Sequence, residues 1–403
     1  MAREELATKP IAVISAGASG ITHAADAAME GREVRLFEFP EFFTEKRAIR
    51  HTNTVTLQGP QMNCYGLKHE GDATISLISD NMADVVKGAG IIILSLPAVG
   101  FERACEELVP LLEDGQVIHF MAGNFGTLVL AKKMREHGCT KKILMGEWSS
   151  QPFGTRIVSD ENGVELPLME MFYRAITLRG CALPSTDTDE WMDTIKYIPS
   201  MFSVKHPEKG DSVVDVSFSN INPLLHPAAS VLSVSMMENW TTVLKQKPFY
   251  FSIYSHGFCK SVSEVQYRIY LEQKATVEAL GTTMWQLTKE GNFSDRSSIL
   301  APEYEGKDYK VVPYETEWTE QAGAGPHTIS HRYITEDTPV GLSAQRAFAR
   351  AVGVPTPTMD AVIHLASVMN GTDFNTTGWS LETLGFAGWS KEAIIEYLHT
   401  GKL

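Results

Sequence analysis

The segment Ile11-Ala-Val-Ile-Ser15-Ala-Gly17-Ala-Ser19-Gly20 decides the fold expected for the N-terminal part of the chain. It begins with an aliphatic run that predicts a short buried strand, and the strand leads directly into a turn with two glycines. Small apolar residues at 21–30 then predict a helix, and residues 33–37 predict a second strand that ends next to Glu38. This order of strand, glycine turn, helix, strand and acidic residue is typical of a dinucleotide-binding site.

The glycine turn has a mechanical reason to bind a pyrophosphate. Gly17 would let the backbone approach the phosphates, Gly20 would let the helix pack on the strand, and the helix N-terminus would offer free N–H groups. Ser15 stands where the usual pattern has its first glycine, so a plain strand-to-helix turn is the alternative interpretation. We expect Ser15, Gly17, Ser19 and Gly20 to contact the cofactor.

Glu38 is expected to accept hydrogen bonds from the hydroxyls of the adenosine ribose. An acidic residue at this place would repel a phosphate on the ribose, which favours NADH over NADPH. Arg32 and Arg35 lie close by in the sequence, so NADP stays possible.

Alternating strands and helices continue through the first half of the chain. Residues 91–94, 117–120 and 143–145 predict further buried strands, and residues 101–112 predict a helix between two of them. This alternation predicts a Rossmann-like domain, in which helices cover both faces of a parallel sheet. Pro97 and Ala98 follow one strand at the carboxyl edge, where ligands of open α/β sheets bind, so we assign them to the nicotinamide side.

Past Met145 the pattern changes. Residues 156–166 predict a hairpin around Asn162-Gly163 that extends the sheet together with a strand at 171–178. Beyond Asp211 the apolar residues recur at helical spacing, over residues 231–244, 266–287, 342–352 and 358–369. The polar segment between His206 and Asp211 marks the boundary, so we expect a dinucleotide-binding domain at 1–208 and a helical domain at 209–403.

Composition excludes several classes of partner. The chain of 403 residues has 35 basic and 49 acidic residues and a net charge of -14, with no long basic stripe to attract nucleic acid or anionic lipid. Its longest apolar stretch, residues 90–101, is too short to span a bilayer. The five cysteines are scattered without metal-binding spacing, so we expect no metal and a cytoplasmic location. We expect a monomer or a homodimer.

Two segments of the second half contain residues that are suited to catalysis. They are Asn220-Ile-Asn222-Pro-Leu-Leu-His226-Pro227 and Arg332-Tyr-Ile-Thr-Glu-Asp337. Reduction of a C=N or C=O bond needs a group that exchanges a proton near neutral pH, and histidine is the usual choice. Asn222 lies one helical turn before His226, so both side chains would share a helix face.

Both segments resemble the signature stretches of the opine dehydrogenases, the family that includes octopine dehydrogenase and N-(1-carboxyethyl)norvaline dehydrogenase. The resemblance covers nearly the whole chain, because Gly146-Glu-Trp-Ser-Ser150, Val354-Pro-Thr-Pro357 and Leu381-Glu-Thr-Leu-Gly385 also fall in family order. It implies a helical second domain like that of 6-phosphogluconate dehydrogenase. It also implies NAD(P)H-dependent joining of an L-amino acid to a 2-oxo acid such as pyruvate through an imine.

The resemblance also implies roles for single residues. His226 would be the general acid and base, paired with Asp337, while Arg332 would bind a substrate carboxylate. The resemblance also makes Arg156 a weaker candidate for substrate binding. The spacing from His226, rather than the resemblance, suggests that Asn222 would bond the cofactor carboxamide or the substrate. Pro339 follows Asp337 as at a helix start, where the helix dipole favours a carboxylate.

Each of these residues also has a purely structural interpretation. Asp337 could be a helix cap, Arg332 one half of a surface ion pair, and Asn222 a capping or core residue. For the whole chain, the alternatives are a dehydrogenase of a simple 2-oxo or 3-hydroxy acid, and a protein that senses dinucleotides without catalysis.

The segment between Tyr309 and Gly325 is longer than the resemblance leads us to expect. It carries Glu315, Glu317 and Glu320 just before the second signature stretch, and these carboxylates would favour a cationic amino acid as substrate. A solvated surface loop is the alternative.

Overall fold

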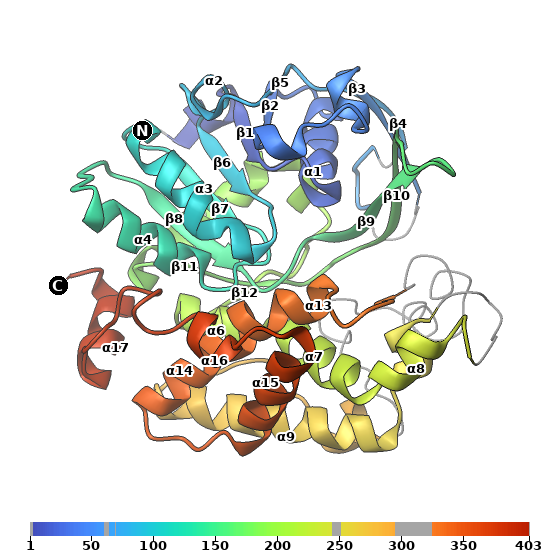
Figure 1. Cartoon of the computed structure of the whole chain (residues 1–403). Coiled ribbons are helices and arrows are strands. Elements are labelled where there is room, and N and C mark those ends of the chain that lie inside the picture. Colours follow the sequence, from blue (N-terminus) through green and yellow to red (C-terminus); the bar gives the residue numbers. More distant parts are fainter. Residues whose placement is uncertain (1–2, 60–63, 69, 244–250, 295–324, 403) are drawn as a thin grey trace. The chain divides into compact units, whose positions relative to one another are not determined.

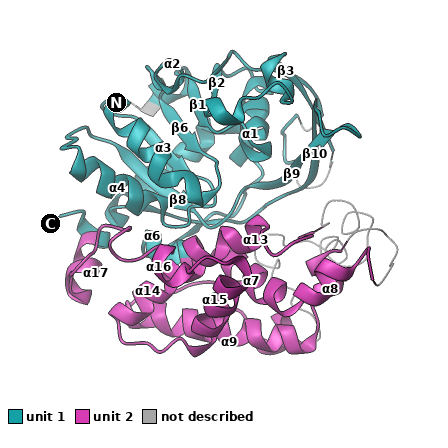
Figure 2. Ribbon diagram, in the orientation of Figure 1, with its two compact units in different colours: residues 1–217, 398–402 teal, residues 218–397, 403 magenta. Residues whose placement is uncertain are grey.

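The computed structural model describes residues 3–59, 64–68, 70–243, 251–294 and 325–402. The chain divides into two compact units, coloured teal and magenta in Figure 2. Unit 1 comprises residues 1–217 and 398–402, and unit 2 comprises residues 218–397 with residue 403. The structural division therefore lies between Ser217 and Phe218, later in the chain than the boundary predicted from composition. The segment between Tyr309 and Gly325 lies almost wholly outside the described residues, so its role stays a hypothesis.

The main sheet of unit 1 has eight strands in the order β12-β11-β8-β7-β6-β1-β2-β5 (Figure 1). All neighbouring strands are parallel except β8 and β11, which are antiparallel. The Rossmann-like parallel sheet predicted from the sequence is thus confirmed. The strands are β1 (Ile11–Ile14), β2 (Val34–Phe37), β5 (Leu77–Ser79), β6 (Ile91–Leu94), β7 (Val117–Phe120), β8 (Leu144–Trp148), β11 (Arg179–Leu183) and β12 (Glu208–Lys209).

The strand order fixes where a ligand can bind in unit 1. From β1 the sheet continues through β2 on one side and through β6 on the other, so the direction of winding reverses between β1 and β6. Ligands of such sheets bind at this reversal, beyond the carboxyl ends of the strands. The helices of unit 1 are α1 (Ala18–Met29), α2 (Met82–Val86), α3 (Phe101–Leu108), α4 (Gly126–Glu136), α5 (Thr188–Met192) and α6 (Val213–Phe218), the last of which ends in the first residue of unit 2.

A second sheet in unit 1 corrects one prediction. The hairpin around Asn162-Gly163 exists, but its strands β9 (Phe153–Ser159) and β10 (Glu165–Arg174) do not extend the main sheet. They pair instead with β3 (Thr54–Gln58) and β4 (Gly71–Thr74) in the order β4-β3-β10-β9. The predicted strand at 171–178 is also wrong in part, because β10 ends at Arg174 and β11 is the strand that joins the main sheet.

Unit 2 is helical over its described residues, as predicted. Its helices are α7 (Asn222–Leu232), α8 (Val234–Asn239), α9 (Lys260–Ala279), α10 (Lys289–Asn292), α13 (Arg332–Thr335), α14 (Ser343–Ala351), α15 (Pro357–Asn370) and α16 (Phe374–Thr377), with α17 (Lys391–Thr400) reaching into the residues assigned to unit 1. Two π-helical turns, η9 (Ile253–Gly257) and η10 (Asp337–Leu342), interrupt the regular helices. The predicted helices at 231–244 and 266–287 are wrong in extent, because a break at Ser233 separates α7 from α8 and α9 ends at Ala279.

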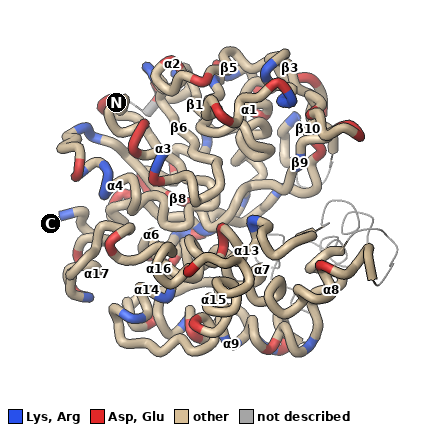
Figure 3. Tube along the Cα trace, in the orientation of Figure 1, with Lys and Arg blue, Asp and Glu red and all other residues tan. Residues whose placement is uncertain are grey.

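The surface charges of unit 1 are mixed in sign. Lys132 and Lys133 on α4 pair with Glu136, and Lys133 also pairs with Glu106 on α3, which lies beside α4 (Figure 3). Lys132 and Lys133 are therefore each paired with a carboxylate. Among the described helices, none is both long enough and apolar enough to span a lipid bilayer.

Candidate functional site

The glycine turn of unit 1 has the backbone that its sequence position requires. Ser15 has a φ of 83°, in the left-handed region that glycine normally occupies, and its Oγ accepts a hydrogen bond from the Gly17 N–H at 3.4 Å. A Cβ on Gly20 would lie 1.8 Å from the Ser15 carbonyl oxygen, so only glycine fits there. A Cβ on Gly17 would lie 3.8 Å from the Ser15 Oγ, its nearest neighbour, so Gly17 faces open space. These are the shapes that a turn needs to admit a pyrophosphate.

Two helix N-termini of unit 1 differ in how their N–H groups are satisfied. Among the described residues, no side chain is seen to accept from the first-turn N–H groups of α1, where Gly17 is the N-cap and Ser19 lies in the first turn. By contrast, the buried Glu147 on β8 caps α4, because its carboxylate accepts from the Phe125 N–H at 3.3 Å and the Thr127 N–H at 3.0 Å. An uncapped helix N-terminus attracts anions. The turn before α1 therefore fits the phosphates of a dinucleotide.

Glu38 directly follows β2, and its side chain bonds the backbone of the glycine turn. One carboxylate oxygen accepts from the Ala16 N–H at 3.2 Å and from Arg47 at 3.2 Å, and the other accepts from the Phe39 N–H at 2.9 Å. Its side chain is buried, and burial raises the pKa of Glu38 despite these bonds. Arg47 also pairs with Glu165 at 2.7 Å, so these three residues carry two carboxylates against one guanidinium.

Arg32 and Arg35, which kept NADP possible as the cofactor in the sequence analysis, both bond groups other than Glu38. Arg32 donates to the carbonyl oxygens of Leu6 and Lys9, and Arg35 pairs with Glu33 at 2.7 Å. Neither guanidinium pairs with Glu38 among the described contacts. Arg47 is therefore the guanidinium that pairs with Glu38.

The carboxyl edge of the sheet ends in unusual backbone beside α4. Pro97 is exposed and Ala98 is buried after β6, as a short turn leads into α3. After β7, the residues Ala122, Asn124 and Phe125 all have positive φ, of 56°, 41° and 64°. Left-handed residues other than glycine are costly and gather at functional sites. The Glu147 carboxylate, bonded at both ends of the Phe125–Thr127 segment, holds this backbone in place.

The centre of the candidate site in unit 2 is His226, on α7. Its Nδ1 lies 2.8 Å from Asp337 Oδ2, and its Nε2 lies 2.8 Å from the hydroxyl of Tyr254. The ring of Tyr333 stacks on the imidazole with centroids 3.8 Å apart and an angle of 16° between the planes. The His226 and Asp337 side chains are only 5% and 8% exposed. Unit 2 thus brings together the predicted histidine and aspartate, and fixes the imidazole at both nitrogens.

Irregular helical turns place both partners of His226. Asp337 is the first residue of η10 and Tyr254 lies in η9, and π-helical turns of this kind are frequent at functional sites. The turn η10 packs closely against α7. A Cβ on Gly341 of η10 would lie only 2.3 Å from the ring of Pro223 on α7. Glycine at 341 therefore lets Asp337 approach His226.

The other predicted substrate residues occupy different positions. Arg332 on α13 is 62% exposed and pairs with Glu336 at 2.9 Å, so it lies one turn from Asp337 with a partner of its own. Asn222 is the first residue of α7, and its described hydrogen bond is from its backbone N–H to Asn220. Arg156 lies exposed on β9 in unit 1, in register with Glu170. The structure therefore groups Arg332 and Asn222 with the His226 unit and Arg156 with the other unit.

Sequence reasoning missed two residues that contact His226. Tyr333 belongs to the signature stretch, so its aromatic side chain was a signal that could have been used. Tyr254 lies in no motif, and only the fold brings it to His226. Glu147 was quoted as part of the family pattern, but its buried capping role has no sequence signal.

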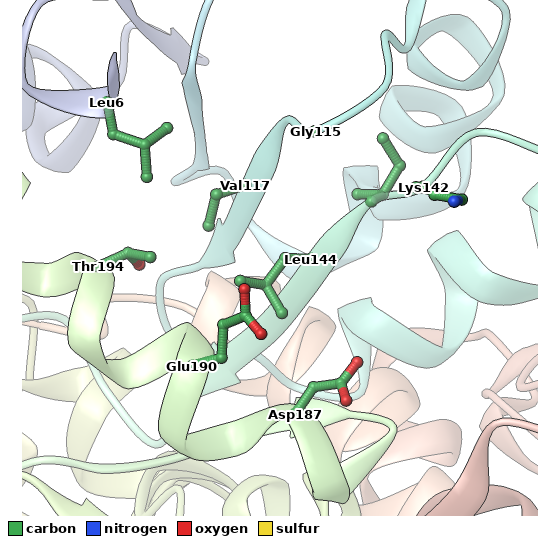
Figure 4. Close-up of a pocket in the computed structure, with 9 residues that line it drawn as sticks. Leu6, Gly115, Val117, Lys142, Leu144, Asp187, Glu190 and Thr194 are labelled. Atoms are coloured by element: carbon green, nitrogen blue, oxygen red, sulfur yellow. The ribbon is translucent and has the colours of Figure 1, made fainter. Parts of the chain in front are cut away.

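A cavity in unit 1 lies away from these residues. It has a volume of about 250 Å³ and is lined by Val117 and Leu144, which begin β7 and β8, together with Lys142, Asp187 and Glu190 (Figure 4). It therefore opens at the amino edge of the sheet. The glycine turn and the Pro97-Ala98 corner follow the carboxyl ends of their strands, so this cavity is not the dinucleotide site.

Comparison with known proteins connects both units to one family. A family model described as NAD/NADP octopine/nopaline dehydrogenase, alpha-helical domain, matches residues 209–370. An opine dehydrogenase of Arthrobacter sp. (strain 1C) is 25% identical over 394 residues, which cover 96% of this chain and 98% of that protein. The helical part of the chain thus matches the octopine/nopaline dehydrogenase model, and the chain as a whole is similar to an opine dehydrogenase.

Solved structures of opine dehydrogenases share the fold along nearly the whole chain. Octopine dehydrogenase with NADH and pyruvate matches with a TM-score of 0.67 and 18% identity, covering 98% of this chain and 99% of that one. Yersinopine dehydrogenase with NADP+ matches with a TM-score of 0.63 and 15% identity, covering 98% of this chain and 100% of that one. At these identities the likeness shows the fold, a parallel-sheet domain followed by a helical one.

Proposed function

We propose that this protein is an opine dehydrogenase, which joins an L-amino acid to a 2-oxo acid, expected to be pyruvate, by reducing the imine between them. The similarity to opine dehydrogenases supports an oxidoreductase that acts on CH–NH bonds with NAD(P). The observation that carries the reaction type for this chain is the buried His226–Asp337 pair at 2.8 Å. A cytoplasmic location stays a prediction from the sequence.

Residues of unit 1 would hold the cofactor. Gly17 and the uncapped N-terminus of α1 would face the pyrophosphate, with Ser15, Ser19 and Gly20 shaping the turn. Glu38 would face the adenosine ribose, and Pro97 and Ala98 would border the nicotinamide. When bound, NADH supplies the hydride. The carboxylates around Arg47 support NADH as the preferred form.

Residues of unit 2 would handle the proton. Because the Asp337 carboxylate accepts at Nδ1, the imidazole proton that leaves or returns must be on Nε2. His226 can then supply a proton as the C=N bond is reduced and take one in the reverse reaction. Arg332 would bind a substrate carboxylate bidentately with the guanidinium edge not used by Glu336, and Asn222 would bond a polar group one turn from His226. Arg156 stays a weaker substrate candidate.

The test is NADH consumption by the purified protein. Pyruvate is supplied alone and with pools of neutral, acidic, basic or aromatic L-amino acids, and the masses of the products are measured. Oxidation of NADH that requires an amine and yields the reduced conjugate is the expected result. Oxidation by pyruvate alone would replace the proposal with a simple oxo-acid reductase. Tight NADH binding without turnover, also with other oxo acids and with NADPH, would point to a sensor.

A further inference from the structure

Both nitrogens of His226 already have hydrogen-bond partners within unit 2. Nδ1 bonds Asp337, and Nε2 lies 2.8 Å from the Tyr254 hydroxyl. Tyr333 covers one face of the ring at 3.8 Å. A proton leaves an imidazole nitrogen in the plane of the ring, along its hydrogen bond. A proton that leaves Nε2 therefore meets the oxygen of Tyr254 first.

We propose that Tyr254 relays the proton between His226 and the substrate, an inference that rests on the proposed function. In the direction of reduction, the Nε2–H bond of His226 breaks and a new O–H bond forms on Tyr254. The original Tyr254 O–H bond breaks at the same time, and its proton goes to the substrate nitrogen or oxygen while the hydride of NADH reduces the carbon. Tyr254 ends neutral, as it began, and His226 has lost one proton.

The anchoring of Tyr254 favours a relay over a side chain that swings away. At the start of η9, Ser252 donates its N–H to His256 Nδ1 at 3.0 Å, and the Ile253 N–H donates to the Gly325 carbonyl at 3.0 Å. The Tyr254 ring also meets the buried Phe258 edge to face, with centroids 5.7 Å apart. Backbone and ring are thus both held, so the hydroxyl stays at Nε2.

The Tyr254 hydroxyl also donates a long hydrogen bond to a second tyrosine. Tyr333 lies with its own hydroxyl 3.5 Å from that of Tyr254, at the limit of a hydrogen bond. A phenol holds its proton at neutral pH and both donates and accepts, so Tyr254 suits a relay rather than an independent acid. In this proposal His226 is the proton reservoir and Tyr254 is the group that contacts the substrate.

The decisive experiment is the variant Tyr254→Phe, which removes one oxygen and keeps the ring contact with Phe258. We expect kcat to fall roughly a hundredfold, the usual size of a lost acid–base step, with KM values within about threefold of wild type. Thermal melting and NADH affinity are expected to match wild type. The matched control is Tyr267→Phe on α9, which removes a hydroxyl that has no hydrogen-bond partner among the described residues; its kcat is expected to stay unchanged.

A fall in kcat of less than about tenfold in Tyr254→Phe overturns the relay. An unchanged kcat with a lower KM for the oxo acid also overturns it, and would mean that Tyr254 blocks Nε2 until substrate displaces it. The parallel variant His226→Ala separates this failure from that of the proposed function. If His226→Ala is inactive while Tyr254→Phe is fully active, only the relay is wrong. If His226→Ala is also active, the proposed role of His226 fails with it.

Discussion

His226 is the residue on which the proposed chemistry depends most directly. Its imidazole is buried and fixed by Asp337, so removing the imidazole affects proton transfer and also leaves a buried carboxylate without this partner. In His226→Ala we expect kcat to fall by roughly a hundredfold or more, in a protein that is still folded but melts at a lower temperature than wild type. Steady-state turnover and a melting curve on the same preparation check both halves of this expectation. Near wild-type turnover would remove His226 from the mechanism.

Asp337 can be tested without changing the shape of its side chain. In Asp337→Asn the amide keeps the volume but offers no carboxylate to the Nδ1–H, so the imidazole loses the partner that fixes its tautomer. We expect kcat to fall at least about tenfold, with NADH affinity unchanged. The control is Asp360→Asn on α15, whose carboxylate pairs with Arg346 and Arg350 instead. Equal losses in the two variants would mean that the effect is structural.

At the scale of elements, the turn between β1 and α1 contains two glycines with different roles. Gly20→Ala would place its Cβ against the Ser15 carbonyl, so we expect a loss of about 1–3 kcal/mol in the free energy of unfolding. Gly17→Ala meets no such contact, so its stability should match wild type while NADH affinity falls at least about tenfold, because the Cβ occupies the approach of the phosphates. Urea unfolding and NADH titration measure the two effects. Wild-type NADH affinity in Gly17→Ala would contradict the assigned site.

The cap of α4 makes the stability of unit 1 depend on pH. Burial raises the pKa of Glu147 to about 7, above its ordinary value of 4.5, so between these values the folded state binds more protons than the unfolded state. Its contribution to stability is full below pH 4.5 and is lost as the pH rises through about 7, by up to about 3 kcal/mol. Glu147→Gln lacks this titration. Urea unfolding of both proteins at pH 5 and pH 8 should show wild type losing stability relative to the variant, whereas parallel changes would mean that Glu147 stays ionised throughout.

At the scale of the whole molecule, charge acts on the encounter with substrates. The net charge of -14 repels an anionic oxo acid over long distances, and salt screens this repulsion. We expect kcat/KM for pyruvate to rise about twofold to threefold when the ionic strength goes from about 0.01 M to 0.15 M. A steep fall in kcat/KM would instead indicate that positive charge around Arg332 dominates the approach.

The sequence predicted the parts of the fold that carry a local pattern. Strands such as β1 and β6 are buried on both faces, so they appear as continuous aliphatic runs. The second sheet escaped prediction because β3 and β4 are short and polar, and because β10 pairs with a strand far away in the chain. Helix ends were misplaced where α7 stops at Ser233, since apolar residues continue past the break.

Contacts within the site could be predicted only from the family resemblance, because the spacing of residues in the sequence does not show which side chains meet. The resemblance paired His226 with Asp337, which lie far apart in the chain and meet in the structure. Nothing in the sequence around Tyr254 distinguishes it from the other tyrosines, because its partner is set by the packing of η9 on α7. Tertiary contacts of this kind have no period or motif.

The left-handed backbone of Ser15 has a consequence for how relatives of this enzyme are found. A side chain at this point of the turn is tolerated when its oxygen can bond the N–H two residues later, as Ser15 does with Gly17. Asparagine and aspartate enter the left-handed region even more readily. A search pattern that demands three glycines would therefore pass over such enzymes, whereas one that allows serine, asparagine or aspartate first and insists on the last glycine would retain them.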